Sequence, residues 1–177
     1  VREPQQVIVS RIGSGSYVET PDASWLGGLL TEEMLRERSN LMEILDFRRT
    51  LEPRIAYLAA NRVTENNAAE LREIIAGMRD AMRSERLEEW HEGDAAFHSH
   101  VAVMTGNFLY EKTVSLLLQA MVTFRTSPLL SDQMRASQAA HETIAGFILA
   151  GNGQKAAEAM EDHVVMAVRT ALDALPG

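Results

Sequence analysis

LDFRRTLEPRIAYLAANR, residues 45–62, has apolar side chains spaced three and four residues apart, the period of an α-helix with one buried face. The pattern extends upstream, so we expect a long helix over residues 40–61. Pro53 within it predicts a kink near residues 49–53. This period sets the fold class, because it recurs through the rest of the chain. The expected inward stripe consists of Leu41, Ile44, Leu45, Arg48, Glu52, Ile55 and Ala59.

From Trp25 onward the chain repeats this helical pattern, interrupted by short breaks. Thr64 is placed to cap the start of one helix, and AGNG at residues 150–153 is typical of a tight helix–helix turn. Connections this short favour antiparallel packing of sequential helices. The predicted fold class is an all-α antiparallel bundle of six or seven helices. The expected helices span residues 24–38, 40–61, 65–83, 86–104, 107–127, 131–150 and 153–174.

Residues 7–18, VIVSRIGSGSYV, differ from everything that follows. Two short β-like runs flank a turn that contains two glycines, which is typical of a β-hairpin. We therefore expect a small hairpin in front of the bundle.

Composition excludes several classes of protein. The chain has 177 residues, enough for one domain with a full core, and no cysteine, which excludes disulfides and thiolate metal ligands. Its net charge of −8 disfavours attraction of the whole surface to nucleic-acid phosphates. No stretch resembles a membrane span or a signal peptide, so we expect a cytoplasmic protein with no membrane partner.

Residues 94–100, DAAFHSH, place an acid and two histidines within one expected helix. Asp94 and His98 are four residues apart and share a face, whereas His100 lies about 200° round from His98. A carboxylate and an imidazole on one face suit a salt bridge, a catalytic dyad or half of a metal site.

His141 and His163 are equidistant from residue 152, inside the predicted turn between the last two helices. In an antiparallel helix pair they lie at the same height, about 16 Å from the turn. Both belong to largely apolar stripes, which indicates that both side chains point into the bundle.

Asp94, His98, His141 and His163 would together offer one carboxylate and three imidazoles from three helices. This set suits one divalent ion such as Zn²⁺, Ni²⁺, Mn²⁺ or Fe²⁺, with positions left open for water or a ligand. The alternative is a metal-free core in which the histidines are ordinary buried residues and Asp94 pairs with His98. Spacing alone leaves both open.

Arg48 falls on the inward stripe of the helix over residues 40–61. One interpretation is a salt bridge to Glu52, one helical turn away. The other is a guanidinium that binds the carboxylate of a small effector.

Enzyme motifs are poorly represented, and we assign no catalytic residue. Neither His-Glu dipeptide completes H-E-x-x-H, because residues 95 and 145 are alanine. A bundle metalloenzyme with metal-activated water remains an alternative. Its general base would be Glu142 or Glu161, nominated only because Glu142 follows His141 and Glu161 lies two residues before His163.

The stretches LDFRRTLEPRIAYLAANR, DAAFHSHVAVMTGN, AAHETI and EDHVV resemble the FadR-type C-terminal (FCD) effector domain of GntR-family bacterial transcription regulators. The resemblance covers residues 40–174. It implies that Asp94, His98, His141 and His163 are metal ligands. It also implies that Arg48 occupies the position of an arginine used by effector pockets.

RIGSGSYVETP resembles the wing of a GntR winged helix-turn-helix. The resemblance implies a remnant of the DNA-binding domain over residues 1–20, a linker with a short helix over 21–39, and an FCD-like effector-binding and dimerisation domain over 40–177. It implies a homodimeric, ligand-responsive regulator that binds a small organic acid and contacts operator DNA through its N-terminal domain, largely absent from this chain. The alternatives are the metalloenzyme above and a metal-free helical interaction module.

Overall fold

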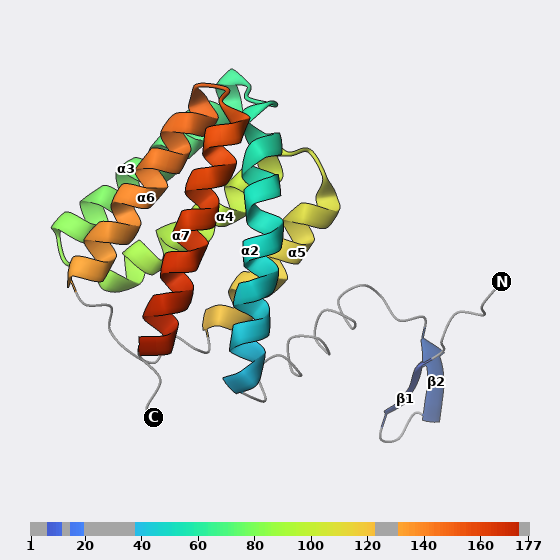
Figure 1. Ribbon diagram of the computed structural model, residues 1–177. Coiled ribbons are helices and arrows are strands. Elements are labelled where there is room, and N and C mark those ends of the chain that lie inside the picture. The colour runs from blue at the N-terminus through green and yellow to red at the C-terminus, as the bar shows by residue number, and fades with distance from the viewer. Residues whose placement is uncertain (1–6, 12–14, 20–37, 123–130, 174–177) are drawn as a thin grey trace.

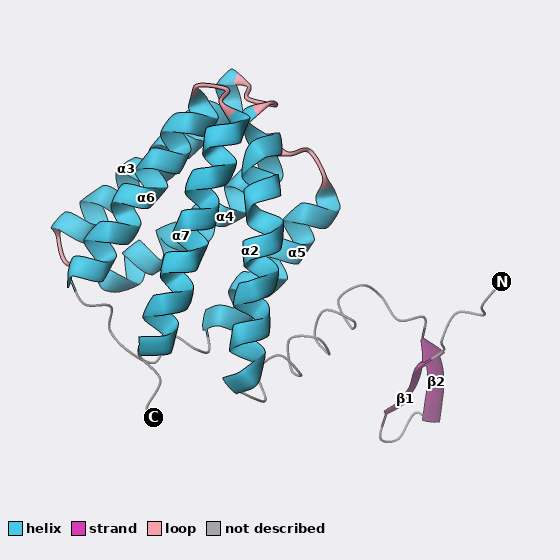
Figure 2. Ribbon diagram, in the orientation of Figure 1, coloured by secondary structure: helices cyan, strands magenta, loops and turns pink. Residues whose placement is uncertain are grey.

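The computed structural model describes residues 7–11, 15–19, 38–122 and 131–173, which form a β-hairpin followed by six helices (Figure 1, Figure 2). The all-α fold class predicted from the sequence is therefore confirmed. The elements are β1 Val7–Arg11, β2 Gly15–Glu19, α2 Arg38–Ala60, α3 Glu65–Arg83, α4 Leu87–Met104, α5 Phe108–Val122, α6 Ser131–Leu149 and α7 Gly153–Asp173.

The predicted helix boundaries agree closely with the observed ones. α3 has the predicted bounds, and α4 and α6 each differ from them by one residue at one end. α7 begins at the predicted residue, and the last position of its predicted range, 174, lies outside the described residues. Pro53 lies inside α2, as expected. The helix expected over residues 24–38 falls outside the described residues except for its last position, and so do residues 123–127 of the helix expected over 107–127.

The two strands form the hairpin expected over residues 7–18. They pair antiparallel, with Val7 opposite Glu19 and Arg11 opposite Gly15. The glycine-containing turn between them lies outside the described residues, except at its ends.

Helix α2 packs on several other helices. It lies side by side with α7 and also contacts α4, α6 and α5 (Figure 1). α3 packs on α4 and α6 instead. The expectation that sequential helices pack together is therefore wrong for α2 and α3, and also for the described parts of α5 and α6. The start of α7 approaches the end of α2 closely, since a Cβ at Gly153 would lie 2.7 Å from Asn61 Nδ2 and 3.0 Å from the Tyr57 carbonyl oxygen.

Local hydrogen bonds define the helix ends that position the later helices. Thr64 caps α3 in a capping box with Asn67, as its side chain predicts. At the end of α6, Asn152 N–H donates to the Phe147 carbonyl at 2.9 Å while Gly151 adopts a φ of 69°. This Schellman turn reverses the chain into α7 and sets the register of the α6–α7 pair.

The seven residues of the predicted inward stripe of α2 are all buried. None of the helices in the described part of the chain is long and apolar enough to cross a membrane. The core is unusual in holding several buried charged or titratable side chains next to large apolar ones such as Phe97. These buried groups are Arg48, Glu52, His98, His100, His141 and His163.

Candidate metal centre

Three helices bring four potential metal ligands together. Asp94 and His98 come from α4, His141 from α6 and His163 from α7. One nitrogen or oxygen atom from each lies within 4.8 Å of the others. All three histidines are buried, whereas the Asp94 side chain keeps 21% of its surface exposed, so the cluster reaches solvent on the Asp94 side.

The Nε2 atoms of the three histidines converge. His98 Nε2 lies 3.4 Å from His141 Nε2 and 3.3 Å from His163 Nε2. Asp94 Oδ1 lies 3.3 Å from His141 Nε2 and 3.9 Å from His98 Nε2. One atom from each residue thus faces a common point.

These separations fit a metal ion. Ligand atoms about 2.0–2.2 Å from a zinc ion lie about 3.3–3.6 Å from one another in a tetrahedral site, close to most of the measured distances. Facing Nε2 atoms cannot all satisfy one another, because each neutral imidazole has a single N–H. Within the described residues, the buried Nδ1 atoms of His98, His141 and His163 also have no hydrogen-bond partner. The donor set therefore suits a cation at its centre.

The protonation states of these side chains also favour the binding of a metal ion. Burial lowers the pKa of His141, although its hydrogen bond to Asp94 opposes the shift. Burial lowers the pKa of His163 further, aided by His141 and His98. Burial alone would raise the pKa of Asp94, but the hydrogen bond from His141 and the nearby histidines hold it well below its usual range. His141 and His163 are thus neutral imidazoles beside an ionised carboxylate near neutral pH.

A second buried group adjoins the cluster. Arg48 Nε donates to Glu52 Oε1, Arg48 Nη2 donates to Glu52 Oε2 at 3.3 Å, and Nη2 lies 3.4 Å from His98 Nε2. Arg48 Nη1 also contacts Met121 Sδ at 2.8 Å. Burial alone would lower the pKa of Arg48, but Glu52 raises it, so the guanidinium is a fixed cation at the edge of the cluster.

The sequence pattern of the FCD domain matches residues 43–166, which include all these residues. The chain belongs to the FCD domain family. The HTH-type transcriptional regulator LutR of Bacillus subtilis (strain 168) is 28% identical over 158 residues, covering 86% of this chain and 71% of LutR. The uncharacterized HTH-type transcriptional regulator YieP of Escherichia coli (strain K12) is 28% identical over 148 residues, covering 80% of this chain and 63% of YieP.

Solved structures share the fold. Streptococcus agalactiae GntR superposes with a TM-score of 0.70 at 25% identity, over 92% of this chain and 74% of that protein. E. coli McbR/YncC superposes with a TM-score of 0.70 at 14% identity, over 77% of this chain and 66% of that protein. At that lower identity the likeness concerns the fold alone.

Two further histidines of this FCD domain lie outside the cluster. His100 points toward α3, where its Nε2 lies 2.8 Å from the Asn67 carbonyl oxygen and its Nδ1 lies 3.4 Å from Glu70. This agrees with its predicted position on another face of α4. The His91 ring packs against Trp90, with ring centroids 5.4 Å apart.

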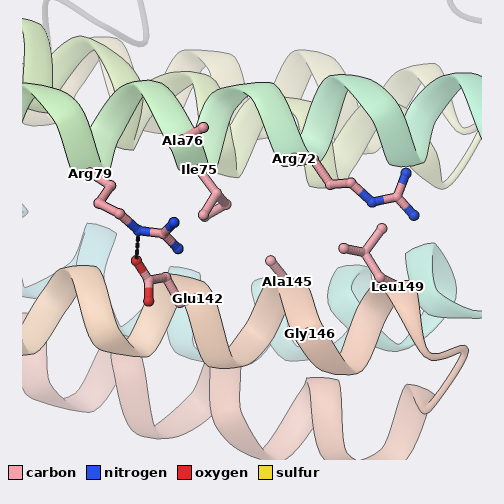
Figure 3. Close-up of a pocket in the computed structure, with 8 residues that line it drawn as sticks. All are labelled: Arg72, Ile75, Ala76, Arg79, Glu142, Ala145, Gly146 and Leu149. Atoms are coloured by element: carbon pink, nitrogen blue, oxygen red, sulfur yellow. Dashed lines mark hydrogen bonds and ion pairs between the residues drawn. The ribbon is translucent and has the colours of Figure 1, made fainter.

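The carboxylates nominated as catalytic bases do not join the cluster. Glu142 accepts hydrogen bonds from Arg79 and Gln138, and Glu161 is exposed. Glu142 and Arg79 face each other across a groove between α3 and α6 that has a volume of about 290 Å³ (Figure 3). The groove therefore lies apart from the four-residue cluster. Its lining residues are Arg72, Ile75, Ala76, Arg79, Glu142, Ala145, Gly146 and Leu149.

Glu52 is the residue of the site that sequence reasoning undervalued. The sequence pairs it only with Arg48, but its Oε2 also lies 2.7 Å from His98 Nδ1. The signal was its place on the inward stripe, because a buried carboxylate needs more than one polar partner to offset its desolvation.

Proposed function

We propose that this chain is the effector-sensing part of a GntR-family transcription regulator and that its FCD domain binds one divalent metal ion together with a small organic acid. The observation that carries this proposal is the convergence of three histidine Nε2 atoms and Asp94 Oδ1. Zn²⁺, Ni²⁺, Mn²⁺ and Fe²⁺ all suit a set of three imidazoles and one carboxylate.

In this proposal Asp94, His98, His141 and His163 hold the metal. When bound, the ion supplies a Lewis-acid centre with positions left open for oxygen ligands. Asp94 is the ligand nearest to solvent, so a small molecule would enter on its side.

The charges of the site favour an anion as the effector. A divalent ion and Arg48 are opposed by the carboxylates of Asp94 and Glu52, which leaves one uncompensated positive charge in a largely buried site. Such a charge is unfavourable unless it is paired. A carboxylate on the metal would neutralise it and would also accept the remaining Nη2 hydrogen of Arg48.

The role in transcription rests on the relatives. LutR and YieP are both named HTH-type transcriptional regulators, and this chain spans 71% and 63% of their respective lengths. The β1–β2 hairpin corresponds in the proposal to the wing of the DNA-binding domain. With a net charge of −8 on this chain, the contacts to operator DNA belong to the N-terminal part.

The proposed regulator works as a homodimer. Effector binding would favour one of two packings of the helical bundle and thereby change the spacing of two DNA-binding domains on their half-sites. An effector that alters neither operator affinity nor this spacing in the full-length protein would overturn this mechanism.

Elemental analysis of the purified chain tests the metal site directly. We expect one divalent ion per chain, and none in the His141→Ala/His163→Ala variant. Small carboxylates are then titrated into the metal-loaded chain and the metal-free chain, with binding expected only in the former. No metal after incubation with Zn²⁺, Ni²⁺ and Mn²⁺ would favour the metal-free interaction module instead.

A further inference from the structure

Glu52 is a buried carboxylate on α2, with 2% of its surface exposed. It lies next to the cluster but contributes no atom to it. Burial alone would raise its pKa, but Arg48 and His98 hold the pKa well below its usual range, so Glu52 is ionised. A charged group that the core keeps out of water needs a structural reason to be there.

The contact with His98 gives one reason. Glu52 Oε2 lies 2.7 Å from His98 Nδ1, which is within the range of a charge-assisted hydrogen bond. Although the two atoms are this close, His98 Nδ1 makes no hydrogen bond of regular geometry within the described residues. An ionised carboxylate only accepts hydrogen bonds, so it favours the tautomer with the proton on Nδ1. That tautomer leaves the Nε2 lone pair of His98 facing the cluster.

The contact with Arg48 gives a second reason. Both Glu52 oxygens accept hydrogen bonds from the guanidinium, which restricts its rotation and holds Nη2 at 3.4 Å from His98 Nε2. One carboxylate therefore orients both an inner imidazole and the cation next to it.

We propose that Glu52 is a positioning residue that aims the Nε2 lone pair of His98 at the metal and fixes Arg48 next to that nitrogen. The proposal rests on the metal-binding function proposed above. Histidines that bind metals through one nitrogen commonly donate the other N–H to a carboxylate, and loss of such a partner lowers metal affinity about 10- to 100-fold.

The two members of the buried pair should affect metal affinity in opposite directions. Glu52 adds negative charge and orients a ligand, whereas Arg48 is a cation 3.4 Å from a ligand nitrogen. Loss of Glu52 should weaken metal binding, and loss of Arg48 should leave it unchanged or strengthen it. A purely structural role for the pair predicts that either loss weakens binding alike.

The test is a competition titration of Zn²⁺ against a chromophoric chelator, with folding checked by circular dichroism. We compare the wild type with Glu52→Gln, Arg48→Met and the double variant Arg48→Met/Glu52→Gln. The double variant removes both buried charges together and so remains informative if Glu52→Gln alone unfolds. Glu142→Gln is the matched control, because Glu142 also pairs with an arginine but contacts no cluster residue in the described interactions.

We expect about 10- to 100-fold weaker Zn²⁺ binding for Glu52→Gln and for the double variant. Arg48→Met and Glu142→Gln should bind at least as tightly as the wild type. Equal affinities in all variants, or equal losses for Arg48→Met and Glu52→Gln, would overturn the role of Glu52 and leave the metal site standing. A wild type that binds no Zn²⁺ would overturn the proposed function itself.

A second measurement does not depend on metal. Nitrogen-15 NMR of the histidine side chains in the metal-free chain reports which ring nitrogen carries the proton. We expect His98 as the Nδ1–H tautomer in the wild type and a shift toward Nε2–H in Glu52→Gln, whose amide can donate to Nδ1. A wild-type His98 protonated on Nε2 would overturn the proposal.

Discussion

Arg48 Nη2 lies 3.4 Å from His98 Nε2, so a buried guanidinium faces the same nitrogen that faces two other histidines. Arg48 can donate to that lone pair or a metal can bind to it, but not both at once. A metal bound to that nitrogen would leave one Nη2 hydrogen of Arg48 available to another acceptor. Arg48 is therefore suited to bind an anion that the metal also binds.

Arg48→Met should reduce carboxylate affinity of the metal-loaded chain about 10- to 100-fold, because a hydrogen bond to a charged group contributes about 1.5–3 kcal/mol. Isothermal titration calorimetry with a carboxylate that binds the wild type measures this change. Metal content of the variant should stay at the wild-type level. Unchanged carboxylate affinity would remove Arg48 from the effector site.

Trp90 offers an optical signal for metal binding, since its ring centroid is 6.2 Å from that of His141. In a Trp25→Phe background, Trp90 is the single tryptophan of the chain. Co²⁺, which has unpaired electrons, should quench its fluorescence with saturation at one equivalent. His141→Ala and His163→Ala should each abolish the saturable quenching.

His100→Ala is the matched control for these two variants. His100 is buried on the same helix as His98, but its ring nitrogens contact Asn67 and Glu70. The Co²⁺ titration of His100→Ala should therefore match that of the background protein. Equal loss of quenching in all three alanine variants would contradict the assignment of ligands.

The features of the fold that depend on local sequence patterns were predictable from the sequence. The 3.6-residue period determined the buried stripe of α2, and Thr64 and Gly151 supply the cap and turn that their residue types indicate. The packing of helices that are far apart in the sequence was not predictable from such local patterns. α2 packs on α7, with Gly153 close to Asn61 and Tyr57, and no local pattern reports such a long-range contact.

The candidate site, like the fold, was predictable from the sequence only in part. Symmetry about the α6–α7 turn indicated that His141 and His163 share a height, and helical spacing paired Asp94 with His98. The contact between Glu52 and His98 depends on how far α2 is rotated against α4, which spacing does not determine. The sequence could therefore mark Glu52 as buried without showing which imidazole it orients.

Stability of the metal-free chain should fall as the pH drops below about 6.5. Burial lowers the pKa of His141 and His163 in the folded chain below the value of about 6.5 that they have when unfolded. In this range the unfolded chain binds protons that the folded chain does not, so the free energy of unfolding decreases with falling pH, by at most about 1.4 kcal/mol per pH unit for each histidine.

A second decrease should begin near pH 4. The pKa values of Asp94 and Glu52 are held below their unfolded values, so their contribution to stability is lost as the pH falls through this lower range. Urea unfolding at a series of pH values, with a chelator present, measures both steps. His141→Leu/His163→Leu should flatten the step below pH 6.5, and an unchanged slope there would show that other groups cause it.

Gly93→Ala should destabilise the chain, because the added Cβ would lie 2.5 Å from Met78 Cγ where α4 packs on α3. Overpacking of this kind costs about 1–3 kcal/mol, against a gain of at most about 1 kcal/mol in helix propensity. Gly77→Ala is the control, since no atom lies within 4 Å of its added Cβ, and it should stabilise by about 0.5–1 kcal/mol. Urea unfolding compares the two. Because Gly93 precedes Asp94, Gly93→Ala should also bind metal more weakly. Equal stability and equal metal affinity in the two variants would show that the Met78 side chain moves aside at no cost and that this contact does not fix the position of α4.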